Sequence, residues 1–124
     1  LTDMAWHTIT EPFEGDVEQF EVASMAPSLV LPVVPGTAMA PAFGHIFSGG
    51  YAAGYYGYKW AEVLEADAFS LFKEKGIFNR EVSGSFRENI LSKGGTEHPM
   101  ELYVRFRGHK PETKALIEKM GLGK

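Results

Sequence analysis

Apolar and polar residues alternate with a helical period through most of this 124-residue chain. The longest such run begins near Tyr51 and ends in a basic last turn before Gly76, a residue type that commonly follows a helix C-terminus. One face of the run is apolar and consists of Trp60, Val63, Leu64, Ala68 and Leu71. The pattern therefore predicts a long helix from Tyr51 to Lys75 that buries much of its surface.

Shorter helices are expected on either side of the long one. Residues 1–7 suit the last turn of a helix, and Asp16 with Gln19 forms a capping-box pattern for a helix that Pro27 would end. Three more helices are predicted to start at Ser85, Pro99 and Pro111 and to end at Gly94, Gly108 and Gly121, respectively. No stretch shows the sustained alternation that a half-buried strand requires.

One long segment does not fit any regular element. Residues 27–43 contain Pro27, Pro32, Pro35 and Pro41 together with Gly36. Because proline lacks a backbone donor, this density excludes a regular helix or a central strand. Long loops of this kind inside a compact domain are often functional. The fold class is therefore predicted to be all-α with a long Pro/Gly-rich loop.

Composition and charge exclude several classes of function. The 12 basic and 16 acidic side chains give a formal net charge of −4, which argues against a nucleic-acid partner. The chain has no cysteine, so disulfides, thiolate zinc sites and cysteine nucleophiles are excluded. No apolar run approaches the roughly 20 residues of a membrane span, so no membrane partner is expected.

A stretch rich in glycine and tyrosine leads into the long helix. Tyr51, Tyr55 and Tyr58 fall at i, i+4 and i+7, which would place three hydroxyls on one face of the predicted helix. Gly49 and Gly50 precede them and give the backbone freedom to approach a ligand closely. Two interpretations are open at this point. The stretch is either a surface for a polar ligand or part of a core helix that uses tyrosine as a bulky apolar residue.

The histidines offer one candidate for chemistry. The chain has four, His7, His45, His98 and His109, and none belongs to a His-Glu-x-x-His motif. His98 and His109 flank helix ends and are expected to be solvated, and His7 is given no role. His45 stands at the start of the Gly/Tyr stretch. By spacing alone the chain therefore offers hydroxyl donors and an imidazole, without an activating base or a metal.

Residues 43–69 resemble the C-terminal part of the thimet oligopeptidase family of zinc peptidases through the sequence FGHIFSGGYAAGYYGYKWAEVLEADAF. The similarity extends to Asp3-Met-Ala-Trp-His7, Gly76-Ile-Phe-Asn79, Ile90-Leu-Ser-Lys-Gly-Gly95 and Phe106-Arg-Gly108, and so covers essentially the whole chain. The resemblance implies the C-terminal helical part of a mainly helical, two-lobed, zincin-type peptidase.

The resemblance also implies a cofactor and partners. In the family, a His-Glu-x-x-His motif and a downstream Glu bind one zinc ion, and these ligands lie upstream of the region seen here. Residues 1–124 are therefore expected to be a single C-terminal segment of a larger cytoplasmic enzyme, inactive alone. Expected partners are short peptide substrates and the missing N-terminal part of the same polypeptide. Without that part, the apolar long helix is expected to make the fragment self-associate.

Carried over position by position, the resemblance assigns roles to six residues. The implied catalytic residues are Tyr55 and Tyr58, and the implied substrate-binding residues are His45, Gly49, Gly50 and Tyr51. His45 would hydrogen-bond the substrate backbone, and Tyr51 would line the site beside the glycine pair. Tyr55 and Tyr58 would donate to the substrate carbonyl and the oxyanion, whose charge develops only as the reaction proceeds. A peptidyl-dipeptidase is expected; the alternatives are an internally cleaving oligopeptidase and a helical interaction module without catalytic activity.

Overall fold

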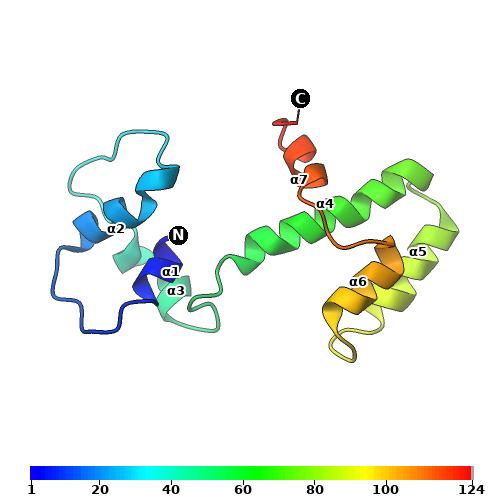
Figure 1. Ribbon diagram of the computed structural model, residues 1–124, viewed down its shortest axis with the longest axis horizontal. Helices are drawn as coiled ribbons and strands as arrows, with labels where there is room; N and C mark the ends of the chain where they lie inside the picture. Colours follow the sequence, from blue (N-terminus) through cyan, green and yellow to red (C-terminus); the bar gives the residue numbers. More distant parts are fainter. Residues whose placement is uncertain (124) are drawn as a thin grey trace. The chain divides into compact units, whose positions relative to one another are not determined.

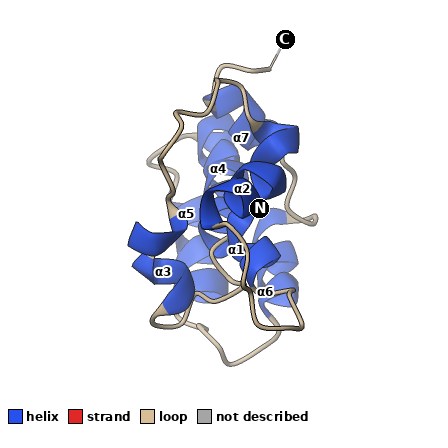
Figure 2. Cartoon of the chain, turned by 90° about the vertical axis from the view of Figure 1, so that its left-hand side faces the viewer, coloured by secondary structure: helices blue, strands red, loops and turns tan. Residues whose placement is uncertain are grey.

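All regular elements in residues 1–123, the part that the computed structural model describes, are helices (Figures 1 and 2). The α-helices are α1 (Thr2–Trp6), α2 (Val17–Met25), α3 (Gly44–Phe47), α4 (Gly57–Lys75), α5 (Arg80–Phe86), α6 (Pro99–Arg107) and α7 (Lys114–Lys119). Short 3-10 turns occupy Ala26–Ser28 and Ala40–Ala42, and a π-helical turn occupies Arg87–Leu91. The predicted all-α class is confirmed. The chain divides into two compact units, residues 1–57 and the residues from Tyr58 onward.

The first unit is built around an aromatic cluster. Trp6, at the end of α1, packs against Phe20 of α2 and against Phe13, with ring centroids 4.2 and 4.9 Å apart. Phe47 of α3 lies 6.1 Å from the same indole. Beside this cluster Ile46 is fully buried, with 0% of its surface exposed. The cluster therefore joins α1, α2 and α3, the three α-helices that lie in this unit.

The Pro/Gly-rich loop is held by two acidic side chains of α2. Both carboxylate oxygens of Glu18 accept from the backbone N–H of Gly36, at 2.9 and 3.1 Å. Glu21, which is buried, accepts from the N–H groups of Met39 and Ala40 at 3.1 and 3.0 Å. The prolines prevent this segment from forming regular structure, so its other backbone N–H groups need acceptors outside a helix or sheet. The two glutamate side chains supply acceptors for three of them. The predicted loop is confirmed, and its backbone is ordered by ion-to-backbone hydrogen bonds.

The second unit has its own apolar core. Ala68 of α4, Val82 of α5, and Tyr103 and Phe106 of α6 are buried together. Phe72 and Phe86 pack against this core, with ring centroids 5.9 Å apart. Within this unit α6 lies beside the π-helical turn that continues α5 (Figure 1). The predicted stops of α4 and α6 are confirmed, since Gly76 and Gly108 adopt φ values of 107° and 87°.

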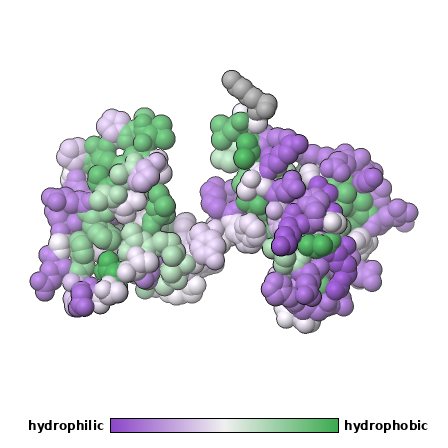
Figure 3. Space-filling model, in the orientation of Figure 1, coloured by the Kyte–Doolittle hydropathy of each residue, from purple (hydrophilic) through white to green (hydrophobic). Residues whose placement is uncertain are grey.

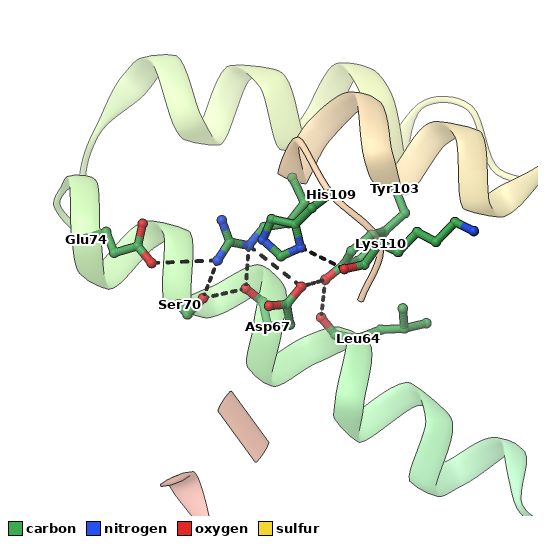
Figure 4. A network of polar contacts seen from close by, with 8 residues as sticks. Leu64, Asp67, Ser70, Glu74, Tyr103, His109 and Lys110 are labelled. Atoms are coloured by element: carbon green, nitrogen blue, oxygen red, sulfur yellow. Dashed lines mark hydrogen bonds and ion pairs between the residues drawn. The ribbon is translucent and has the colours of Figure 1, made fainter. Parts of the chain in front are cut away.

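A buried polar network links α6 to α4 (Figure 4). The hydroxyl of Tyr103 donates to Asp67 Oδ2 at 2.6 Å, and the carboxylate of Asp67 is itself buried. The guanidinium of Arg107 donates to the carbonyl of Asp67 at 3.1 Å and to the Ser70 hydroxyl at 2.9 Å, and it lies 3.6 Å from a Glu74 oxygen. Burial, together with the hydrogen bond to Asp67, raises the pKa of the Tyr103 hydroxyl. Each charged group in the network therefore has partners.

Besides α4, which starts at Gly57 and not at Tyr51, two helices begin at residues other than those predicted. The helix expected to start at Ser85 starts at Arg80, because the Asn79 side chain accepts from the N–H groups of Glu81 and Val82 and caps it. Ser85 thus lies inside α5. The last helix starts at Lys114, after Thr113, and not at Pro111. In contrast, Asp16 accepts from Gln19 N at 2.9 Å and caps α2 as predicted.

Candidate functional site

Three of the predicted site residues lie together in the first unit. The imidazole of His45, in α3, has its ring centroid 5.8 Å from that of Tyr51 and 5.9 Å from that of Tyr55. Phe43 packs edge-on against Tyr55 with ring centroids 4.7 Å apart. The imidazole therefore lies close to both phenol rings, and Phe43 packs near the imidazole as well, with ring centroids 6.2 Å apart.

This group borders a shallow hollow of about 400 Å³. The hollow is lined by Gly44, His45, Ser48, Gly49 and Tyr51. Tyr51 is 40% exposed, which does not fit the interpretation of this stretch as a core helix. Gly49 adopts φ of 91°, a backbone conformation that residues other than glycine rarely adopt. Gly50 does not have a positive φ, so its backbone conformation does not require glycine.

The predicted stripe of three tyrosines on one helix is wrong. Residues 52–56 form consecutive turns, and α4 begins only at Gly57. Ala53 has φ of 54°, a left-handed conformation that costs an ordinary residue about 1–2 kcal/mol and breaks a right-handed helix. Tyr51 and Tyr55 are therefore placed by turns. Only Tyr58, the second residue of α4, lies on a helix.

The turn that carries Tyr55 is bound by a buried carboxylate. Asp3, in α1, accepts from Ala53 N through Oδ1 and from Tyr55 N through Oδ2, both at 2.9 Å. Its Oδ1 also lies 2.9 Å from His7 Nδ1. Burial by itself would raise the pKa of the Asp3 carboxyl, but the two backbone hydrogen bonds and the nearby imidazole outweigh it and lower the pKa. Asp3 is thus a stable anion at neutral pH.

Sequence reasoning did not single out Asp3 or assign a role to His7. An acidic residue in the first turn of a helix is favourable at almost any surface helix, so Asp3 carried no distinctive signal. The partners of its carboxylate lie 50 and 52 residues further along the chain, a separation that no local pattern reports. The signal that was available is its place in the motif Asp3-Met-Ala-Trp-His7, in which the acid and the imidazole are four residues apart.

The remaining predicted residues have more limited descriptions. Tyr58 belongs to the second unit and is 45% exposed, so its joint action with Tyr55 stays a prediction. His98 caps α6, since its Nδ1 accepts from Met100 N at 3.2 Å. His109 Nδ1 lies 2.7 Å from the carbonyl oxygen of Lys110. Both of these histidines thus have local backbone partners.

Metal-ligating side chains do not gather in the described part of the chain. Among residues 1–123 there is no group of three or more His, Cys, Asp or Glu side chains arranged to hold a metal ion. The residues present therefore do not form the zinc site that the resemblance implies. Within the same range, none of the helices has the length and apolar character needed to cross a membrane.

Comparisons with known proteins connect this geometry to a family. The model of peptidase family M3 matches residues 1–122. Oligopeptidase A of Escherichia coli is 48% identical over 123 residues, which cover 98% of this chain and 18% of that protein. Oligopeptidase A of Salmonella typhimurium is 62% identical over 81 residues, covering 65% of this chain and 12% of that protein. Dipeptidyl carboxypeptidase of Escherichia coli is 41% identical over 124 residues, covering 98% of this chain and 18% of that protein.

These relatives agree with the resemblance found in the residues themselves, and the chain spans less than a fifth of the length of each of them. The matched region includes the aromatic group around His45, the tyrosine turn and the motif that contains Asp3. With a family model that matches nearly its whole length, the chain belongs to peptidase family M3, the family of thimet oligopeptidase.

Proposed function

We propose that this chain supplies the substrate-facing wall of a zinc peptidase that cleaves short peptides, of the peptidyl-dipeptidase type. The observation that carries the proposal is the match to peptidase family M3 over residues 1–122. The chain spans 18% of oligopeptidase A of Escherichia coli, so most of the proposed active site would come from another part of the polypeptide. That part would hold the zinc ion, which would supply Lewis-acid chemistry, and the chain alone would be inactive.

In the proposed site, the aromatic group of the first unit grips the substrate. His45 hydrogen-bonds the peptide backbone, and Tyr51 lines the hollow next to Gly49. Tyr55 donates to the carbonyl of the bond to be cleaved. Support for this assignment comes from the rings of Tyr51 and Tyr55, which lie 5.8 and 5.9 Å from the imidazole of His45.

Tyr58 is proposed to stabilise the oxyanion. Negative charge develops on the carbonyl oxygen of the peptide bond during hydrolysis, and a hydroxyl placed to meet that charge lowers the barrier selectively. One such donor contributes about 3–4 kcal/mol to transition-state stabilisation. With 45% of its surface exposed, the residue is accessible to a ligand in this chain.

An internally cleaving, oligopeptidase A-like enzyme is a second candidate. It is favoured by the higher identity to oligopeptidase A of Escherichia coli, 48% against 41% for the dipeptidyl carboxypeptidase of the same organism. A helical interaction module without catalysis is less well supported, because it predicts tyrosines packed inward and Tyr51 and Tyr58 are exposed.

The proposed partners are short peptides and the rest of the same polypeptide, in the cytoplasm. Large apolar side chains at the surface support a missing partner surface: Val30, Leu31 and Phe78 are 93%, 77% and 95% exposed. Apolar residues also reach the surface over much of the face of the first unit shown in Figure 3. Unless such surface is covered, a chain of this kind tends to self-associate.

The proposal is tested in the full-length enzyme by comparing wild type with Tyr58→Phe on a blocked peptide. We expect zinc-dependent cleavage by the wild type and a kcat about 100- to 1000-fold lower in the variant, with KM changed only a few-fold. Tyr56→Phe, at a residue that is 67% exposed and has no proposed role, is the matched control and should keep full activity. An unchanged kcat in Tyr58→Phe would contradict the oxyanion role. The lengths of the cleavage products of the wild type distinguish release of dipeptides from internal cleavage.

A further inference from the structure

The turn that carries Tyr51 and Tyr55 does not satisfy all of its backbone N–H groups with hydrogen bonds of its own. Ala53 sits between the two tyrosines at φ of 54°, which an alanine adopts only when its surroundings impose it. The turn has two internal backbone bonds, from Gly54 N to Tyr51 O at 2.9 Å and from Gly57 N to Gly54 O at 3.0 Å. Neither of them uses the N–H of Ala53 or of Tyr55. These two donors therefore need an acceptor from elsewhere in the chain.

Asp3 is that acceptor, and its geometry fixes the turn in one register. Each oxygen of its carboxylate takes one of the two N–H groups, at 2.9 Å in both cases. A single rigid carboxylate can accept both only when Ala53 and Tyr55 present their N–H groups to the same side. Asp3 is 7% exposed, so water does not readily replace it.

His7 holds the carboxylate in turn. Its Nδ1 lies 2.9 Å from Asp3 Oδ1 and 2.8 Å from the Asp3 carbonyl oxygen, and His7 is the residue that directly follows α1. The His7 ring also packs against Phe47 of α3, with ring centroids 5.8 Å apart. Asp3 thus has His7 as a partner at the end of its own helix, and His7 is in turn packed against the helix that carries His45.

The geometry points to Asp3, with His7, as a positioning pair for the catalytic tyrosine turn. The pair does not touch substrate. It sets the place of Tyr55, and through Ala53 that of Tyr51, relative to the imidazole of His45. This inference rests on the proposed function, because it takes Tyr55 as a donor to the substrate.

The first experiment measures the anchor directly, without reference to activity. Asp3→Asn keeps the size of the side chain but replaces one acceptor oxygen by an NH₂ group that faces a backbone donor. Hydrogen exchange of residues 51–56 should become about tenfold faster or more in this variant. The matched control is Asp16→Asn, which makes the same change at an exposed helix cap where asparagine serves equally well. Equal exchange in wild type and Asp3→Asn would overturn the proposal.

The second experiment asks whether the anchor acts through Tyr55 in the full-length enzyme. Asp3→Asn should lower kcat about 10- to 100-fold with KM changed less than about threefold, as for a misplaced catalytic group. In a Tyr55→Phe background the further loss of kcat should fall below about threefold, because the catalytic hydroxyl being positioned is already gone and Tyr51 is proposed only to bind substrate. A loss of equal size in both backgrounds would show a merely structural role and overturn the proposal.

Circular dichroism and the zinc content of the enzyme would show whether Asp3→Asn folds. A third variant tests the proposal even if Asp3→Asn does not fold. His7→Gln removes the imidazole that orients the carboxylate and leaves Asp3 itself in place. It should lower kcat about three- to tenfold, again dependent on Tyr55, and unchanged kcat would overturn the role of the pair. A wild type that cleaves no peptide would defeat the proposed function, whereas the exchange experiment would still decide whether Asp3 anchors the turn.

Discussion

The buried network of the second unit makes a quantitative prediction for Tyr103→Phe. The change removes one hydroxyl and leaves the ring, which is buried in the core between α4 and α6. That hydroxyl donates to Asp67 Oδ2 at 2.6 Å and lies 3.3 Å from the carbonyl oxygen of Leu64. The nearest remaining partner of Oδ2 is the Arg107 Nε, at 3.7 Å, which is too long for a hydrogen bond.

The expected cost follows from the charge and burial of Asp67. Its side chain has only 4% of its surface exposed, so water cannot easily replace the lost donor. Hydrogen bonds to charged groups contribute about 1.5–3 kcal/mol to stability, and leaving a buried acceptor without its donor brings the loss to the upper part of that range. We therefore expect Tyr103→Phe to lower the free energy of unfolding by about 2–3 kcal/mol.

Urea unfolding followed by circular dichroism at neutral pH measures this difference, with Tyr56→Phe as the control. Tyr56 is 67% exposed and its replacement should change stability by less than about 0.5 kcal/mol. If Tyr103→Phe changes stability no more than the control does, the hydrogen bond to Asp67 contributes nothing net and the reasoning is refuted.

The same pair of proteins gives a pH prediction with a definite sign. Burial, and then the hydrogen bond to Asp67, raises the pKa of Tyr103 above its ordinary value of 10.0. A raised pKa means that the folded protein keeps the proton to higher pH than the unfolded chain. The stabilisation that the Tyr103 hydroxyl contributes is therefore complete below pH 10. Above pH 10 the contribution of this hydroxyl to the free energy of unfolding declines, by at most about 1.4 kcal/mol per pH unit. The stability gap between wild type and Tyr103→Phe should narrow above pH 10, and a gap that widens there would contradict the assignment.

Two further predictions concern the backbone. Glu21→Gln should lower the free energy of unfolding by about 1–3 kcal/mol, because one of the N–H groups of Met39 and Ala40 then loses its acceptor; an unchanged urea midpoint would contradict this. Gly108→Ala should destabilise by about 1 kcal/mol or more because φ is 87°, whereas Gly84→Ala, inside α5 with open space around its Cβ, should stabilise by about 0.5–1 kcal/mol. Thermal melts that shift in the same direction for both glycines would refute the conformational argument.

The sequence by itself determined the features that local chemistry controls. The all-α class follows from the apolar period, and the stops at Gly76 and Gly108 follow from glycine in a left-handed conformation. The cap of α2 at Asp16 is local as well, because donor and acceptor are three residues apart. The family and the candidate residues were also readable, because the motif that carries them is a continuous run. For these features no distant contact had to be known.

The tertiary structure decided where the tyrosines lie. The spacing of Tyr51, Tyr55 and Tyr58 favoured a helix that starts at Tyr51, because it would place the three hydroxyls on one helix face. The chain departs from it because Asp3, 50 residues earlier, accepts the N–H of Ala53 and, with its other oxygen, that of Tyr55. In a helix starting at Tyr51, the N–H of Ala53 would be among the first four, which have no carbonyl partner within the helix, and the N–H of Tyr55 would bond to the carbonyl of Tyr51. The buried carboxylate favours the turn because it accepts from the N–H of Ala53, which such a helix would leave unpaired, and gives the N–H of Tyr55 a charge-assisted bond in place of a neutral one. Only the folded chain brings Asp3 to that turn.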